Sequence, residues 1–425
     1  MSDPSFAFTL VFAAALVLSL LVKFWLNARQ IRHVATHRAA VPAAFTQTIS
    51  LTAHQKAADY TVAKARLGLL EMALAAALLL GWTLLGGLTA LNNLTSQWLG
   101  QGMAQQLGLL GAFVAIGGLI DLPMSWYQTF VLEQHFGFNK TTLKLWLTDL
   151  AKSTVIATLI GLHIVALILW MMSATGYLWW LWAWLFWIGF NLLLLVIYPT
   201  LIAPLFNKFL PLEDEVLKAR VTALMQRCGF SAKGLFVMDG SKRSAHANAY
   251  FTGFGAAKRV VFYDTLLSKL SAPEVDAVLA HELGHFKHKH IIKRIVSIFA
   301  MSLAGFALLG YLTQQSWFYA GLGVQPNLTA ANDALALLLF MLVMPVFSFF
   351  ISPVFAQLSR KHEFEADAYA VMQTSAQDLS TALLKMYEDN ASTLTPDPLY
   401  VRFYYSHPAA SERLLRMQAS AGATV

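Results

Sequence analysis

Long apolar stretches dominate the chain, and each has the length of a membrane-spanning helix. A helix that crosses a bilayer needs about 20 mostly apolar residues. Polar segments separate seven such stretches: 5–26, 67–91, 104–129, 153–173, 177–200, 291–312 and 334–356. We therefore expect seven transmembrane helices. The first is expected to be an anchor, because it is longer than a signal peptide and lacks a small-residue cleavage site.

The composition agrees with this pattern and excludes several classes of protein. Hydrophobic residues make up 57% of the 425 residues, charged residues only 12%, and the mean hydropathy is +0.56. A soluble globular protein carries about 25% charged residues, so a soluble enzyme, a disordered chain and a fibre are excluded. The single cysteine, Cys228, excludes an intramolecular disulfide, a cysteine-based zinc site and an iron–sulfur cluster.

The basic residues alternate with the spans. The 30 Lys and Arg fall in four groups, with seven in 23–66, three in 140–152, fourteen in 208–294 and six in 360–416. None precedes the first span, and none lies near 92–103, 174–176 or 313–333. The positive-inside rule then places the N-terminus outside and the C-terminus in the cytosol. The net charge of +7 thus reports orientation in a bilayer and indicates no nucleic-acid partner.

These patterns predict an all-α polytopic membrane protein in four parts. The expected parts are transmembrane helices 1–5 in 1–200 with cytosolic loops at 27–66 and 130–152, a cytosolic catalytic domain at 201–290, the last two spans in 291–356, and a cytosolic tail at 357–425 that completes the site. Segments 235–238 and 258–264 are rich in β-branched and aromatic residues, so a small α+β unit is expected in the catalytic domain.

The sequence His281-Glu282-Leu283-Gly284-His285 matches the H-E-x-x-H pattern of zinc peptidases. Histidines four residues apart lie on one helical face and can both reach one zinc ion. The intervening Glu282 then lies beside the metal, where it can take a proton from water. Ser271 and Glu274 have the spacing of a capping box, so a helix is expected to begin there.

Gly284 leaves two interpretations open. Glycine inside a helix costs about 1 kcal/mol relative to alanine, so either another element approaches that turn closely or the glycine is simply tolerated. Beyond the motif, His288 and His290 follow on a basic turn. We expect both to lie at the membrane boundary and to bind no zinc.

A catalytic zinc ion usually takes three protein ligands, so one more is needed. Glu363 and Asp367 follow the last span, are four residues apart and share a helical face, whereas Glu365 falls on another face. Glu363 as a ligand, with Asp367 orienting a ligand imidazole, would complete the site. The alternative is a solvated acidic face beside the membrane.

Residues 244–251 lie between the two predicted strands. In zinc peptidases an edge strand beside the metal helix can hold an extended substrate through main-chain hydrogen bonds. Asn248 or His246 could then face the substrate. The alternative for each is an ordinary turn or surface residue.

The chain resembles the type I CAAX prenyl proteases, the Ste24-like integral-membrane zinc metalloproteases of the M48 family. The resemblance covers about residues 50–415 in order, and the zinc motif alone is much less specific than the whole series of blocks. Besides the zinc motif, the blocks are 136–140, 198–199, 202–208, 239–244, 248–251, 253–255, 264–266, 363–367, 406–408 and 412–414. Many relatives carry a tryptophan where this chain has Phe286, so the position remains aromatic.

The resemblance implies a barrel of seven helices around a water-filled chamber, with a zincin-like site closing its cytosolic end. It implies one catalytic zinc ion on His281, His285 and Glu363, with Glu282 as general base. It also implies that Asn248 contacts the substrate or the developing oxyanion. Three further roles follow from it: His407 would stabilise the tetrahedral intermediate, Asp367 would orient a ligand, and Arg413 would brace the site.

The implied activity is cleavage of a peptide near a prenylated C-terminal CaaX sequence or of another membrane-associated peptide. The alternatives are an HtpX-like quality-control protease, a protease that cuts within the bilayer, and a non-enzymatic seven-helix channel or transporter. The basic residues directly after the zinc motif argue against a site within the bilayer. The C-terminus lacks a basic retrieval signal, so we expect a bacterial inner membrane, with the endoplasmic reticulum as the alternative.

Overall fold

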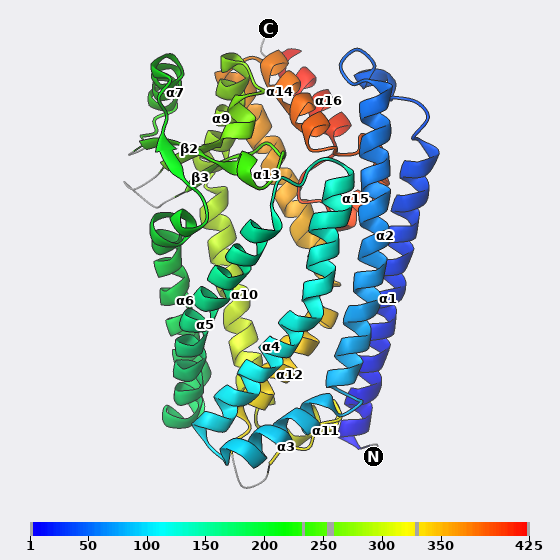
Figure 1. Cartoon of the computed structure of the whole chain (residues 1–425), viewed down its shortest axis with the longest axis vertical. Helices are drawn as coiled ribbons and strands as arrows, with labels where there is room; N and C mark the ends of the chain where they lie inside the picture. The colour runs from blue at the N-terminus through cyan, green and yellow to red at the C-terminus, as the bar shows by residue number, and fades with distance from the viewer. Residues whose placement is uncertain (1–2, 232–233, 253–258, 328–330, 423–425) are drawn as a thin grey trace.

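The computed structural model describes residues 3–231, 234–252, 259–327 and 331–422. Long helices run along most of the molecule, and shorter helices and a small sheet form a cap at one end (Figure 1). The C-terminus lies in this cap and the N-terminus lies at the opposite end (Figure 1). We call this end, formed by the described parts of 201–290 and 357–425, the catalytic cap, because it contains the H-E-x-x-H motif at 281–285.

Six helices in the described residues are long and apolar enough to span a membrane. They are α1 (Pro4–Thr36), α2 (Leu51–Trp82), α4 (Met103–Tyr127), α5 (Leu143–Ala174), α6 (Trp179–Ile197) and α10 (His290–Leu312). α12 (Asp333–Ser348) and α13 (Ser352–Gln373) are apolar enough only as a pair and meet at 66°, so the described residues contain six membrane-capable helices, or seven if this bent pair counts as one span. The predicted stretch 334–356 therefore contains a sharp bend. The predicted fold class, a polytopic helical protein with a small α+β part, is confirmed.

Two segments that we expected as loops are largely helical. α1 continues to Thr36 and α2 begins at Leu51, so much of 27–66 extends the two spans beyond the apolar stretches. The two helices pack on each other there, and Arg38 and Asp59 form an ion pair at 2.6 Å. In 130–152, a π-helix, η2 (Gln128–Glu133), continues α4, and α5 has already begun at Leu143. Hydropathy marks only the part of a helix that contacts lipid, so it misses these polar extensions.

The helices are packed tightly at the end far from the catalytic cap. A core of buried side chains joins the N-terminal half of α1 and α12 to the ends of α2, α4, α5 and α10 at that end, with Phe12, Leu109, Leu169 and Leu339 fully or almost fully buried. The short helices α3 (Gly87–Leu99) and α11 (Ser316–Ala320) lie across the same end (Figure 1). The bundle is thus closed at the end that carries the N-terminus.

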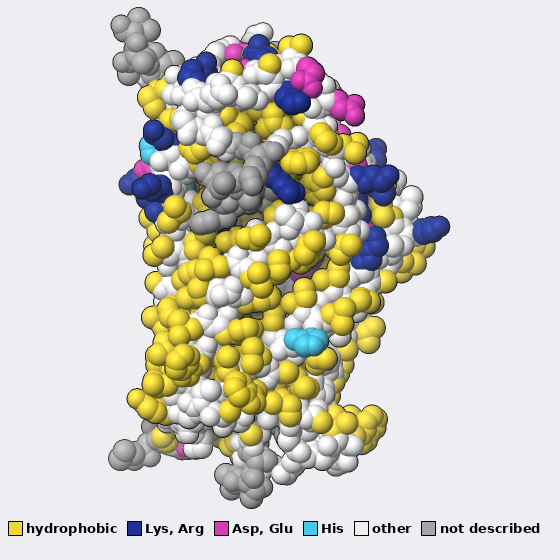
Figure 2. All heavy atoms as spheres, turned by 90° about the vertical axis from the view of Figure 1, so that its left-hand side faces the viewer, with side chains coloured by type: hydrophobic (Ala, Val, Ile, Leu, Met, Phe, Trp, Pro, Cys, Tyr) yellow, Lys and Arg dark blue, Asp and Glu magenta, His cyan; other side chains and the backbone are white. Residues whose placement is uncertain are grey.

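The outer surface has the polarity of a membrane protein. Hydrophobic side chains cover the middle of the face in Figure 2, and Lys and Arg gather toward the catalytic cap. Large apolar side chains such as Leu119, Val155 and Leu201 are more than half exposed. In water this surface would aggregate, whereas lipid covers it at no cost.

The sheet has four strands in the order β1-β2-β4-β3. They are β1 (Phe209–Pro211), β2 (Gly234–Met238), β3 (Ala249–Thr252) and β4 (Arg259–Tyr263). β2 and β4 are parallel and the other pairs are antiparallel, which leaves β3 at an edge. Both predicted strands are confirmed where the structure describes them; residue 258 lies outside the described residues, and Asp264 already begins α8 (Asp264–Leu267).

Helices surround the sheet and bury one apolar core with it. They are α7 (Glu215–Arg227), α9 (Ala272–Lys287), α13, α14 (Ala376–Asp389), α15 (Pro398–Tyr404) and α16 (Ala410–Gly422). α9 begins with the predicted capping box, because Ser271 accepts from the backbone of Glu274 and the Glu274 side chain accepts from Ser271 N at 2.7 Å. Gly284 lies where α9 crosses α13, and a Cβ there would lie 2.9 Å from Ala366 Cα. Close approach is therefore the reason for this glycine.

Replacing Gly284 with alanine tests this close packing. The added carbon would meet backbone atoms of α13, so one helix has to shift. We expect Gly284→Ala to lower the free energy of unfolding by about 1–3 kcal/mol, measured as a lower midpoint of thermal unfolding in detergent. Gly305→Ala in α10 is the control, because nothing lies within 4 Å of its added carbon. An equal drop in both variants would contradict the close approach.

Candidate active site

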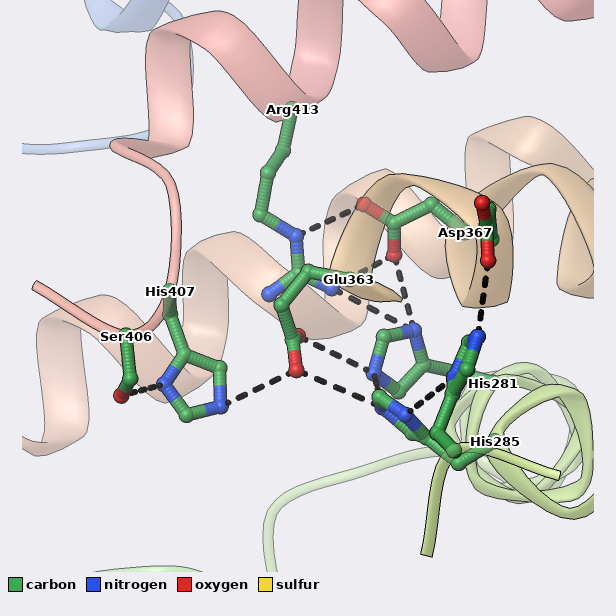
Figure 3. Close-up of polar contacts among 9 residues, drawn as sticks. His281, His285, Glu363, Asp367, Ser406, His407 and Arg413 are labelled. Atoms are coloured by element: carbon green, nitrogen blue, oxygen red, sulfur yellow. Dashed lines mark hydrogen bonds and ion pairs between the residues drawn. The ribbon is translucent and has the colours of Figure 1, made fainter. Parts of the chain in front are cut away.

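Two helices bring three metal-binding side chains together. α9 presents His281 and His285 one turn apart, and α13 presents Glu363 opposite them (Figure 3). The two imidazole Nε2 atoms are 3.3 Å apart. His281 Nε2 lies 3.4 Å from Glu363 Oε2, and His285 Nε2 lies 3.3 Å from Glu363 Oε1. One ligand atom of each residue lies within 4.8 Å of the other two, as one shared cation requires.

The chemistry of these three groups fits a divalent metal ion. Two histidines and one glutamate are a donor set of catalytic zinc in peptidases. Glu363 Oε2 is buried and makes no hydrogen bond, which is costly for a carboxylate unless a cation lies beside it. The two Nε2 atoms also face each other across a gap in which only one could carry a proton. A cation between the three groups would satisfy all of them.

The other ring nitrogen of His281 is held by a buried ion pair. His281 Nδ1 lies 2.8 Å from Asp367 Oδ1. Arg413, from α16, donates from Nε to Asp367 Oδ2 at 2.8 Å and from a terminal nitrogen to Oδ1 at 2.6 Å (Figure 3). All three side chains are buried. A proton on Nδ1 of His281 therefore leaves the lone pair of Nε2 pointing at the metal position.

Burial and hydrogen bonding act in opposite directions on His281. Burial disfavours the charged imidazole, but the neighbouring carboxylates of Asp367 and Glu363 outweigh burial and raise the pKa of His281 to about 9. Burial acts in the same way on Arg413, yet its bonds to Asp367 keep the pKa of the guanidinium above its ordinary value. Without metal, the Asp367 carboxylate therefore lies between two positively charged groups, the imidazolium of His281 and the guanidinium of Arg413.

His285 is held by a partner that sequence reasoning missed. His285 Nδ1 lies 3.1 Å from Nδ1 of His290, and His290 Nε2 lies 2.8 Å from Glu365 Oε2. His290 does begin the membrane helix α10, as expected for a boundary residue, but it is buried against the site. The five-residue spacing from His285 was the available signal, and it could not be used without knowing how the chain turns after α9.

Glu282 lies between the two ligand histidines on α9 and is half-buried. Burial is the main influence on it and raises the pKa of its carboxyl above the ordinary range. A carboxylate whose pKa is closer to neutral accepts and returns a proton more readily at physiological pH. This is the property that a general base requires.

His407 reaches the same site from the chain before α16. Its Nε2 lies 3.4 Å from Glu363 Oε1, and its Nδ1 lies 3.0 Å from the Ser406 hydroxyl (Figure 3). The side chain is 64% exposed, so a substrate can contact it. Six of the seven residues predicted to act with Glu282 therefore lie together: His281, His285, Glu363, Asp367 and Arg413 form a buried group, and His407 lies at its edge.

Asn248 and His246 lie at a different place. Asn248 is exposed just before β3, and its side chain accepts from Ala249 N at 2.8 Å. His246 stacks on Phe138 and contacts Asn390 at 3.1 Å. Within the described part of the chain, no hydrogen bond or ion pair joins either residue to the three candidate ligands. The edge position of β3 beside Asn248 is nevertheless the one expected for binding an extended peptide.

A cavity of about 1050 Å³ begins beside the site. His407 and Arg413 line it at the catalytic cap, and Tyr387 and Asn390 continue the wall. The cavity then extends along α1 and α2 to Ala75, which lies in the second membrane span. The cavity therefore connects the surroundings of His407 with a membrane-capable helix.

Two family models match consecutive parts of the chain. The one described as "CAAX prenyl protease N-terminal, five membrane helices" matches residues 30–208, and the one described as "Peptidase family M48" matches residues 211–421. The chain belongs to peptidase family M48. It is a multi-pass membrane metalloendopeptidase with a peptide or protein substrate, as the sequence predicted.

Similar proteins cover most of this M48 peptidase. CAAX prenyl protease 1 of Saccharomyces cerevisiae is 39% identical over 326 residues, which is 73% of this chain and 72% of the yeast protein. The mouse CAAX prenyl protease 1 homolog is 31% identical and covers 95% of this chain and 94% of its own. The crystal structure of S. mikatae Ste24p aligns with a TM-score of 0.90 at 32% identity, over 96% of this chain and 99% of that one. These matches do not favour a quality-control protease or a channel.

The raised pKa of His281 predicts that metal binding to this M48 peptidase depends on pH. Without metal the imidazole keeps its proton up to a pKa of about 9, and a metal ion has to displace that proton. The apparent zinc affinity should therefore rise by up to about tenfold per pH unit between about pH 7 and pH 8. Titration against a chelator of known affinity measures it.

Asp367→Asn is the matched variant for this pH experiment. It removes the carboxylate that raises the pKa of His281, so the dependence on pH should become shallower. A zinc affinity that stays constant over the same pH range in the unmodified protein would contradict the account.

Proposed function

We propose that this M48 peptidase is a zinc enzyme that cleaves CaaX-type C-terminal peptides of membrane-associated, prenylated substrates. The observation that carries the proposal is that His407, beside the His281–His285–Glu363 set, lines a cavity that extends along the membrane-capable helices α1 and α2. A peptide with an apolar anchor could place its peptide bond at the metal and its lipid in the cavity. The printed names of the relatives, CAAX prenyl protease 1 and its homologs, support the same substrate class.

In the proposed mechanism, His281, His285 and Glu363 would hold one zinc ion. When bound, zinc would polarise the scissile carbonyl and make a water molecule more acidic. Glu282 takes the proton of the attacking water on its carboxylate and delivers it to the leaving amine. His281 keeps its orientation because Asp367 and Arg413 fix its Nδ1 side.

Two further residues are proposed to act on the substrate. His407 Nε2 is placed to donate a hydrogen bond to the oxygen of the tetrahedral intermediate, because its exposed ring stands beside Glu363. Asn248 stands at the start of the edge strand β3, where a peptide bound as an added strand would lie. Asn248 would therefore contact the substrate backbone.

We also propose an orientation in which the N-terminus lies outside and the catalytic cap, built from 201–290 and 357–425, faces the cytosol. The distribution of the 30 Lys and Arg supports it, and these residues gather toward the cap in Figure 2. The eukaryotic relatives favour the membrane of the endoplasmic reticulum over the bacterial inner membrane.

Glu282→Gln tests the proposed general base. The amide keeps the size of the side chain but cannot accept the proton, so we expect kcat to fall by at least about a hundredfold while bound zinc stays near one ion per chain. Turnover of a fluorescent peptide and metal analysis of the same sample measure both. Cleavage by Glu282→Gln at the unmodified rate would remove Glu282 from the mechanism.

A farnesylated CaaX peptide and its lipid-free twin test the substrate. Burial of even two methylene groups is worth about 1.6 kcal/mol, so the lipidated peptide should show at least about tenfold higher kcat/KM. Glu282→Gln serves as the control for contaminating peptidases. Equal kcat/KM for the two peptides would show that the cavity does not bind the lipid, and no cleavage of either would contradict the CaaX proposal.

A further inference from the structure

We propose that His290 and Glu365 are positioning residues for the second metal ligand, His285. They form a hydrogen-bonded chain in which His285 Nδ1 contacts His290 Nδ1 at 3.1 Å and His290 Nε2 contacts Glu365 Oε2 at 2.8 Å. The proposal rests on the metal site of the proposed function and assigns roles to two residues outside the H-E-x-x-H motif.

The backbone after α9 is shaped to place His290 in this chain. α9 ends at Lys287 and α10 begins at His290, with Lys289 between them in the left-handed region at φ 57°. A residue other than glycine adopts this conformation only at a cost, so surrounding contacts have to stabilise it. The turn brings the first side chain of α10 back under the last turn of α9. His290 is consequently buried, with only 4% of its surface exposed.

The protons in this chain have one consistent arrangement with neutral imidazoles. His285 needs a free lone pair on Nε2 to bind a metal, so its proton lies on Nδ1. That N–H can donate only if His290 Nδ1 is an acceptor, which puts the proton of His290 on Nε2. This second N–H donates to the Glu365 carboxylate. The carboxylate thus determines, through His290, which nitrogen of His285 faces the metal.

A neighbouring ring holds His290 in place. His362 stacks on it with ring centroids 4.0 Å apart and planes 15° from parallel. Lys361 lies 3.8 Å from the second oxygen of Glu365 and keeps negative charge there favourable. His362 and Glu365 both belong to α13, the helix that also carries Glu363. The ring of His290 therefore cannot rotate freely away from His285.

A carboxylate orients each of the two ligand histidines, directly for His281 and through a second imidazole for His285. His281 contacts Asp367 directly, and a buried arginine fixes that carboxylate. His285 contacts a carboxylate only through the imidazole of His290. One helix, α13, thus supplies a ligand in Glu363 and the carboxylates that orient both others. Outer partners of this kind typically change metal affinity 10–100-fold when removed.

Zinc affinity and the visible spectrum of the cobalt-substituted protein test the proposal on the full-length chain in detergent. We expect His290→Ala to bind zinc about 10–100-fold more weakly and to shift the cobalt d–d bands, because His285 loses its acceptor. His290→Gln, whose amide oxygen can accept the same hydrogen bond, should recover part of the affinity. Lys287→Ala is the matched control, since Lys287 is exposed at the end of the same helix as His285 and has no hydrogen bond to His285 or His290 among the described residues.

Glu365→Ala keeps the proposal testable if His290→Ala does not fold. The Glu365 side chain is partly exposed, so the fold should tolerate the change, and zinc affinity should fall by about tenfold because His290 loses its acceptor. If folded His290→Ala and Glu365→Ala bind zinc within twofold of the unmodified protein with unchanged cobalt spectra, the proposal is overturned while the proposed function stands. If the unmodified protein binds no zinc, the proposed function fails and this inference fails with it.

Discussion

The catalytic cap depends on one buried ion pair, between Asp367 and Arg413. Both side chains are almost fully buried, and removing one partner of such a pair typically costs 3–5 kcal/mol. The pair joins the C-terminal helix α16 to α13, and Asp367 then orients His281 on α9. Three helices that are far apart in sequence are thereby fixed to each other at the metal position. The packing of the cap and the orientation of the metal ligand His281 therefore depend on the same carboxylate, Asp367.

The helical bundle is packed tightly at one end and contains a cavity near the other. Its tight apolar core lies at the far end, whereas a cavity of about 1050 Å³ lies between the helices and the catalytic cap. The packed core fixes the helices at one end and leaves the cavity beside His407 between α1, α2 and the cap.

The sequence was informative where one helix decides the outcome. Motif spacing placed His281, Glu282 and His285, and a shared helical face linked Glu363 to Asp367. The sequence could not predict contacts that depend on how two helices pack against each other. The partner of Gly284 is the backbone at Ala366, and the role of His290 depends on a left-handed residue, Lys289. Glu365 lies on another face of α13 from Glu363, yet His290 brings it into the site. The 66° bend after α12 leaves no trace in hydropathy.

The central claim is that α9 and α13 together form one zinc site. Anomalous X-ray diffraction from crystals of the unmodified protein, recorded on both sides of the zinc absorption edge, tests it most directly. The account predicts one strong peak per chain, about 2.0–2.2 Å from the Nε2 atoms of His281 and His285 and from the Glu363 carboxylate. A peak elsewhere, or none at this position in crystals grown with zinc, would contradict it.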